Sequence, residues 1–184
     1  MLTGRMVRAE TSGNPDLSST LKRLLARSGE PVLRQAVTQA MRILGRQFVM
    51  GRTIGEALDR ARSPEREGYR HSYDMLGEAA RTADDASHYF DGYRQAIAAL
   101  GKAARGRSIQ EAPGISVKLS ALHPRYEEAK RFRVSSELLP RLKTLAVEAK
   151  TAGIGFTVDA EESERLELSL DLIAHLAGDT DLIG

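Results

Sequence analysis

The sequence predicts an α/β protein, with an N-terminal helical arm followed by the first three βα units of a (βα)8 TIM-like barrel that is incomplete in this chain. Three short apolar segments each end in a charged residue, at Asp74, Lys118 and Asp159, and a stretch with helical periodicity follows each of them. This alternation is typical of a parallel barrel. A closed barrel of eight strands needs about 250 residues. Because this chain has 184 residues, we expect only part of a barrel.

The first part of the chain shows no strand pattern. Residues 1–16 have no apolar period and predict a mobile tail, whereas residues 17–66 predict a helical arm. Leucines recur at helical spacing at the start of this arm. We expect residues 28–29, a Ser-Gly pair, to interrupt the first helix and Pro31 to begin a second one.

Polar residues predict where two further helices begin. Thr53 and Glu56 have the Thr-x-x-Glu form of a capping box, which predicts a third helix from Thr53 towards Arg62. Thr82, with Asp85 three residues later, predicts the start of a longer helix.

Residues 67–184 are assigned to the first part of the barrel. We expect strands near residues 69–74, 115–119 and 154–159, with Gly153 ending the helix before the last of them. An apolar stripe follows each strand, formed in order by Ala86, Phe90, Tyr93, Ile97 and Leu100, by Leu138, Leu142, Leu145 and Ala149, and by Leu166, Leu170, Ile173 and Ala177.

The charged strand ends are predicted to share one site. Side chains alternate between the two faces of a strand, so Ser116, Lys118 and Ser120 lie on a polar face that we expect to line the barrel interior. In parallel barrels the chemistry lies at the carboxyl ends of the strands. The residues expected to converge there are Asp74, Glu78, Lys118 and Asp159.

Composition excludes several classes of protein and site. The chain has no cysteine, which excludes disulfides and thiolate metal sites, and it has no stretch long and apolar enough to span a membrane. The start lacks the apolar region of a secretory signal, so a cytoplasmic protein is expected. The N-terminal arginines form no single run and few aromatics accompany them, so we interpret them as solvated helix faces and expect no nucleic-acid binding. No metal site is predicted, because the four histidines lack ligand-like spacing.

Several residues have a structural interpretation beside the functional one. Lys118 or Asp74 alone would suit a salt bridge, and Asp74 would also suit a turn. Glu161 and Glu162, which follow Asp159, have two interpretations, stabilising the start of a helix or binding Mg²⁺. We prefer the helix start. His123, before a proline, is expected to be a structural loop residue.

Three segments resemble the flavin-dependent proline dehydrogenases. They are residues 72–80 (SYDMLGEAA), 113–126 (PGISVKLSALHPRY) and 159–162 (DAEE). The resemblance is strongest to the proline dehydrogenase domain of the bifunctional bacterial enzymes that oxidise proline to glutamate. It extends from about residue 28 to the end, and the segment around Lys118 is the most specific part of it.

This resemblance implies a distorted (βα)8 barrel that holds FAD, with hydride passing from proline C5 to flavin N5 to give pyrroline-5-carboxylate. Lys118 matches the lysine that lies against the substrate carboxylate. Asp159 matches the catalytic aspartate beside flavin and proline, and Ala160 matches a residue next to the flavin. Asp74 and Glu78 match acids near the substrate pocket.

The chain also departs from the family. It stops where a fourth strand would begin, and the later flavin-binding basic segment and paired arginines have no counterpart, so we expect a piece of a larger flavoenzyme that is inactive alone. A ribbon-helix-helix start is not visible. The resemblance implies NAD only if the parent carries an aldehyde dehydrogenase domain. It also implies a quinone or other electron acceptor, and it leaves peripheral association with the inner membrane open.

Two hypotheses from other classes remain open. The first is a barrel lyase or aldolase in which Lys118 forms a Schiff base with a carbonyl substrate. The second is a non-catalytic fragment that folds or associates only through a partner.

Overall fold

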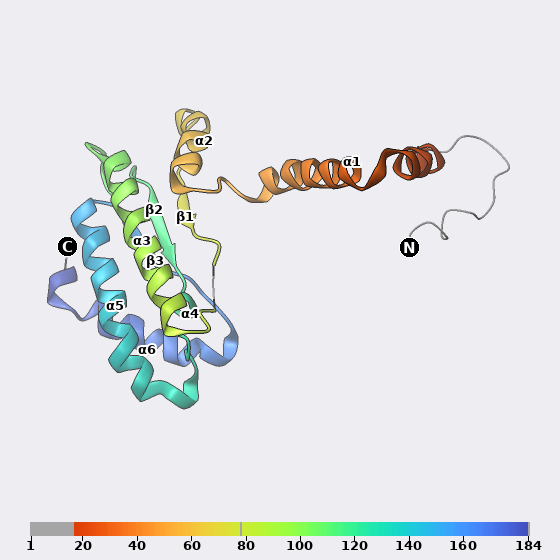
Figure 1. Cartoon of the computed structure of the whole chain (residues 1–184). Helices are drawn as coiled ribbons and strands as arrows, with labels where there is room; N and C mark the ends of the chain where they lie inside the picture. Colours follow the sequence, from red (N-terminus) through yellow and green to blue (C-terminus); the bar gives the residue numbers. More distant parts are fainter. Residues whose placement is uncertain (1–16, 78, 184) are drawn as a thin grey trace. The chain divides into compact units, whose positions relative to one another are not determined.

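The computed structural model describes the backbone of residues 17–77 and 79–183, and the side chains of residues 31–77 and 79–183 (Figure 1). The chain divides into two compact units, Met1–Gly51 and Arg52–Gly184. The predicted mobile tail, residues 1–16, lies outside the described residues.

The described part of the first unit is mainly one helix, α1, which spans Leu17–Phe48. The prediction of two helices in this segment was wrong, because Pro31 lies inside α1 instead of beginning a new helix. A proline removes one backbone hydrogen bond and bends a helix, but the helix can continue beyond it. Large apolar side chains in the second half of α1 are exposed, namely Val32, Leu33, Val37, Met41, Ile43, Leu44 and Phe48.

The second unit begins with helix α2, Ile54–Arg66. The predicted cap is present, because the Thr53 hydroxyl accepts a hydrogen bond from the Glu56 amide at 3.2 Å. The reciprocal bond differs from a standard capping box, since the Glu56 carboxylate accepts from the Arg52 amide. The helix also runs one turn further than predicted, to Arg66.

A three-stranded parallel sheet forms the centre of the second unit, with strands β1 (Ser72–Asp74), β2 (Gly114–Val117) and β3 (Gly155–Val158) in that order. The prediction of parallel strands joined by helices is confirmed. All three strands are shorter than predicted, and β2 ends early because the short helix α4 (Leu119–Leu122) begins directly after Lys118. A parallel connection that carries a helix places that helix on one face of the sheet.

Helices α3 (Ala83–Ala104) and α5 (Arg131–Ala152) pack against each other and cover the sheet (Figure 1). Thr82 and Asp85 form the predicted capping box at the start of α3. Gly153 ends α5 in the left-handed conformation, with φ of 69°. The predicted stripes of both helices are buried except for the half-buried Phe90, so the core lies between these helices and the sheet.

Helix α6 spans Leu166–Ala177, and its predicted stripe was wrong. Leu168, Leu172 and Leu176 are buried, whereas Leu166 and Leu170 are 54% and 53% exposed. Both sets of leucines have helical spacing, so periodicity alone does not say which set faces the core.

Short turns complete the second unit. The 3-10 turns are η1 (Glu128–Lys130), η2 (Ser163–Arg165) and η3 (Thr180–Leu182). None of the helices formed by the described residues has the length and apolar character that a membrane span requires.

Candidate functional site

The carboxyl ends of the three strands bring Asp74, Lys118 and Asp159 together. The Lys118 ammonium lies 2.8 Å from Asp74 Oδ2 and 2.5 Å from Asp159 Oδ2. The Lys118 side chain is only 12% exposed, whereas the two aspartates are 44% and 36% exposed. The site therefore holds one shielded cation between two carboxylates that solvent and small molecules can reach.

The strand register explains this convergence. Asp74 pairs with Ser116, and Val117 pairs with Val158, so Lys118 and Asp159 each follow the last paired residue of their strand. The Asp159 amide continues the ladder by donating to the Val117 carbonyl at 2.9 Å. The two side chains consequently leave neighbouring strands at the same level.

Lys118 is held in its charged form. Burial of the ammonium lowers its pKa, but the hydrogen bonds to Asp159 and Asp74 and the charges of both carboxylates outweigh burial and raise the pKa of Lys118 above its usual value. A lysine that forms a Schiff base needs a lowered pKa so that the neutral amine can attack. The geometry therefore favours an ion-pairing role for Lys118.

Tyr93 fixes the backbone of the lysine. The Lys118 amide donates to the Tyr93 hydroxyl at 3.1 Å, across 25 residues of sequence. Tyr93 is fully buried in α3, and burial raises the pKa of its hydroxyl to about 12. A neutral, immobile hydroxyl thus positions the start of α4.

Ser120 joins the loops that follow all three strands. Its hydroxyl accepts from the Ala79 amide at 3.1 Å, and its carbonyl accepts from the Ala80 amide at 2.9 Å. Its own amide donates to Glu161 Oε2 at 3.0 Å. Ser120 is 4% exposed, so these bonds form away from bulk water. This buried serine ties the loop after β1 and the loop after β3 to the segment that carries Lys118.

The sequence analysis missed Ser120, Tyr93 and this use of Glu161. Parity placed Ser120 on the same face as Lys118, and that was the only sequence signal for it. The helix-start interpretation suits Glu162, which pairs with Arg165 at 3.2 Å beside η2, but Glu161 instead accepts the Ser120 amide.

His123 is part of the support for this loop. It is 3% exposed, and its Nδ1 accepts from the Arg125 amide at 3.1 Å. The assigned tautomer therefore carries its proton on Nε2, which donates to Glu137 Oε2 at 3.1 Å. These contacts suit the structural role expected for His123.

Glu78 and Ala160 are the other residues that the sequence predicted for the site. Glu78 lies outside the described residues. Ala160 follows Asp159 and is exposed, so its small side chain leaves the end of β3 open. Among residues 17–77 and 79–183, no group of three or more His, Asp or Glu side chains is arranged to hold a metal ion.

Comparison with known proteins gives two family matches. A family model described as "Proline dehydrogenase" matches residues 57–184. A second, described as "DNA-binding domain of Proline dehydrogenase", matches residues 1–48. The second match contradicts our expectation that the chain shows no nucleic-acid-binding region. The absence of clustered basic residues and interleaved aromatics was too weak a reason to exclude nucleic-acid binding. That criterion detects only a binding region that forms one local patch in the sequence.

The similar proteins agree with the first match. "Bifunctional protein PutA" from Escherichia coli (strain K12) is 54% identical over 100% of this chain and 14% of the relative, and the protein of that name from Rhizobium meliloti is 52% identical over the same shares. "Proline dehydrogenase" from Deinococcus radiodurans is 26% identical over 86% of this chain and 48% of the relative. The chain thus spans about one seventh of the length of the PutA relatives.

Solved structures show the same similarity. A crystal structure of bifunctional proline utilization A (PutA) protein matches with a TM-score of 0.68 and 50% identity, over 96% of this chain and 18% of that one. PutA from Bdellovibrio bacteriovorus, inactivated by N-propargylglycine, matches with a TM-score of 0.75 over 82% of this chain and 17% of that one. Its identity is 20%, so it supports the fold alone.

Proposed function

Because this chain belongs to the proline dehydrogenase family, we propose that it supplies the first part of a site at which L-proline is oxidised to pyrroline-5-carboxylate with FAD. The observation that carries this proposal is the shielded Lys118 ammonium between the strand-end carboxylates of Asp74 and Asp159. The chain spans 14% of its PutA relatives, so the activity is proposed for a longer protein that contains these residues.

The charges of the site suit an amino acid. Proline at neutral pH carries one carboxylate and one ammonium, and the site presents one ammonium with a carboxylate oxygen of Asp74 2.8 Å away and one of Asp159 2.5 Å away. Lys118 would bind the proline carboxylate by exchanging part of its contact with the aspartates. Asp74 and Glu78 would then balance the charges around the substrate. An uncharged or purely cationic ligand would offer the Lys118 ammonium no negatively charged group to bind.

Asp159 is the proposed catalytic residue. Oxidation of the ring removes a hydride from C5 and a proton from nitrogen, and forms the C=N bond. Asp159 is 36% exposed and lies beside the lysine, so its carboxylate is placed to orient the amine and to accept that proton. Tyr93 and Ser120 would hold the segment that carries Lys118 while this occurs.

The end of β3 fits the edge of a flavin. The side chain of Ala160 is small and exposed, and the neighbouring Thr157 is exposed as well, so a planar ring can approach this backbone. When bound, FAD supplies the acceptor for the hydride. Asp159 and Ala160 are the residues of this chain that would lie against it.

We also propose the domain assignment, with a helical arm at residues 17–66 and the first part of a barrel at residues 67–184. The parallel order β1-β2-β3 supports the barrel part, because consecutive neighbouring strands are the arrangement found in such barrels. By its packing, α2 belongs to the second compact unit, Arg52–Gly184, although this assignment counts it with the arm. A quinone or other acceptor, and NAD in a parent with an aldehyde dehydrogenase domain, belong to the same proposal.

The test compares two lysines in a full-length enzyme that contains this chain. Lys118→Met should weaken a proline analogue that keeps the carboxylate, tetrahydrofuran-2-carboxylate, by about ten- to a hundredfold, because one charge-assisted bond is lost. FAD content should change little. Lys143→Met is the control, since Lys143 pairs with Asp179 and Asp181 on the outer side of α5. Unchanged analogue affinity in Lys118→Met would remove Lys118 from the substrate site.

Borohydride separates the alternative function. If Lys118 forms a Schiff base with a carbonyl substrate, reduction would fix the substrate to Lys118 and increase its mass. We expect no such adduct, because the raised pKa of Lys118 keeps its amine protonated.

A further inference from the structure

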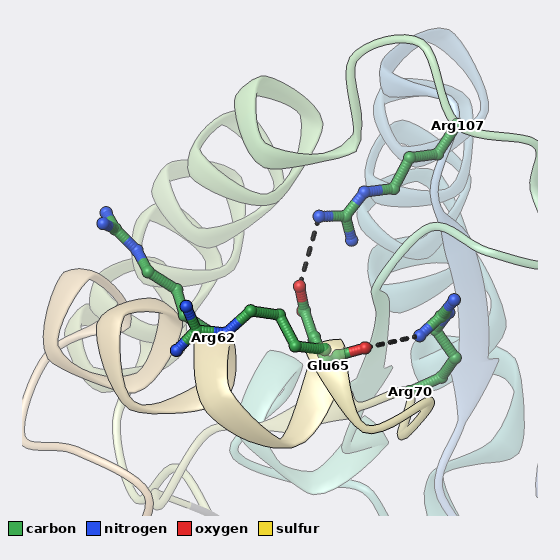
Figure 2. Close-up of a pocket in the computed structure, with 5 residues that line it drawn as sticks. Arg62, Glu65, Arg70 and Arg107 are labelled. Carbon is green, nitrogen blue, oxygen red and sulfur yellow. Dashed lines mark hydrogen bonds and ion pairs between the residues drawn. The ribbon is translucent and has the colours of Figure 1, made fainter.

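A pocket lined by arginines lies at the other end of the sheet, where the strands begin. It is an open depression of about 420 Å³, lined by Arg62, Glu65, Arg66, Arg70 and Arg107. The first three belong to the last turns of α2, Arg70 precedes β1, and Arg107 precedes β2 (Figure 2). The Lys118 site lies at the carboxyl ends of the same strands, so the two sites are separate.

The pocket has more positive charge than its own contacts use. Four arginines face one glutamate, a formal excess of three positive charges. Arg107 pairs with Glu65 Oε2 at 3.1 Å, and Arg70 donates to the Glu65 carbonyl at 3.4 Å, so both approach Glu65 (Figure 2). Arg66 forms no ion pair with any residue that the structure describes. Arg62 pairs only with Asp59, where both side chains are at least 70% exposed and the pair contributes little.

Two buried polar atoms without a partner belong to the segment that directly follows the pocket residue Arg70. Among the described residues, His71 Nδ1 and Tyr73 Oη are the buried side-chain polar atoms that make no hydrogen bond. Tyr73 is 7% exposed, and its ring lies 6.1 Å from that of His71. Burial raises the pKa of Tyr73 to about 12, with the charge of Glu65 also raising it and the charge of Arg107 lowering it, so the hydroxyl is neutral at physiological pH. A buried hydroxyl without a partner destabilises the folded protein.

Helix capping explains part of the cluster. Cations near a helix C-terminus are favourable, and Arg70 donates to the Glu65 carbonyl in the last turn of α2 and to the Tyr69 carbonyl in the loop that follows. This role accounts for Arg70, and the ion pair with Glu65 accounts for Arg107. The helix end also favours Arg66, which lies in the last turn of α2, but it supplies no carboxylate for the Arg66 guanidinium and no partner for the Tyr73 hydroxyl.

We propose that the pocket formed by Arg62, Arg66, Arg70 and Arg107 binds a small multivalent oxyanion. Guanidinium groups bind phosphate and carboxylate oxygens through paired hydrogen bonds, and several of them around one pocket select ligands with more than one negative charge. The Tyr73 hydroxyl is buried in the free protein, so it would donate to the anion only where binding exposes it. This binding is independent of the proposed proline site, because it uses none of that site's residues.

The test is calorimetric titration of the full chain with inorganic phosphate, pyrophosphate and citrate, at an ionic strength held constant with sodium chloride. We expect saturable binding of at least one of them. Preference for pyrophosphate and phosphate would assign the site to phosphate ligands, and preference for citrate would assign it to polycarboxylates. Absence of saturable binding by all three would overturn the proposal.

Matched variants separate a pocket from general charge attraction. Arg66→Gln should weaken binding at least about tenfold, because one charge-assisted contact is lost. Arg105→Gln is the control, since Arg105 is exposed, lies two residues from Arg107 and does not line the pocket. Its effect should stay within roughly twofold. Equal weakening in both variants would overturn the proposal.

Tyr73→Phe tests the hydroxyl. Weaker anion binding in this variant, with an unchanged near-ultraviolet circular dichroism spectrum, would support its contact with the ligand. Unchanged binding together with increased stability would show that the hydroxyl is simply an unsatisfied group and would remove Tyr73 from the site.

Discussion

Replacing Lys118 with methionine should destabilise the protein in a way that depends on pH. Without the ammonium, the Asp74 and Asp159 carboxylates face each other with oxygens at most about 5 Å apart, as the two ion-pair distances require. Their repulsion would be about 3 kcal/mol at an effective dielectric constant of 20 and about 1 kcal/mol in water. Because both aspartates are more than one third exposed, we expect about 1–2 kcal/mol.

The pH dependence follows from the charges that repel each other. In Lys118→Met, the two carboxylates repel each other only while both are ionised. The loss of stability is therefore small where carboxyl groups are protonated and grows as pH rises and they ionise. The variant should be closer to the unmodified protein at pH about 4 than at pH about 7.5, since the usual pKa of aspartate is about 3.9.

Denaturant unfolding, followed by tyrosine fluorescence, measures this difference. The chain has no tryptophan, and all five of its tyrosines lie in the second unit, so the signal reports the unit that carries the site. Lys118→Arg is the control, because it keeps the positive charge. A loss of stability that is equal at both pH values would refute the electrostatic reasoning and would indicate a packing defect instead.

Further variants test the supports of the site and the core. Ser120→Ala removes the acceptor of the Ala79 amide and should cost about 1–3 kcal/mol of unfolding free energy, measured with urea. In the full-length enzyme, Glu161→Ala should lower the rate of proline oxidation. Glu161→Gln should keep most of that rate, because its side chain retains an acceptor for the Ser120 amide. Equal loss of activity in both variants would argue against this hydrogen bond. Leu172→Ala should lower the free energy of unfolding by about 2–5 kcal/mol, because Leu172 is 1% exposed. Leu170→Ala should change it by no more than about 0.5 kcal/mol. Similar losses in the two variants would contradict the orientation of α6. The 184-residue chain alone should bind little FAD, measured by absorbance, and oxidise no proline, measured by dye reduction. It should also self-associate through the unpaired edge of β3, measured by size-exclusion chromatography. A monomeric, flavin-bound and active preparation would contradict this expectation.

The sequence by itself determined the local features of the second unit. Helix caps at Thr53 and Thr82 and the stop at Gly153 depend on residues within one turn, so short patterns were sufficient to predict them. The three strands were also predictable, because apolar segments between amphipathic helices favour parallel strands. Since parallel strands align their carboxyl ends, the approach of Asp74, Lys118 and Asp159 followed from the same pattern.

Only the tertiary structure decided which equally periodic residues face the core and which distant groups meet. Leucines on two faces of α6 have the same spacing, and packing alone buries Leu172 and exposes Leu170. Ser120 reaches Glu161 and the Ala79 amide across 41 residues in each direction. Such contacts depend on strand register and on the path of each loop. Both are set by the packing of the whole unit, and a window of neighbouring residues does not contain that information.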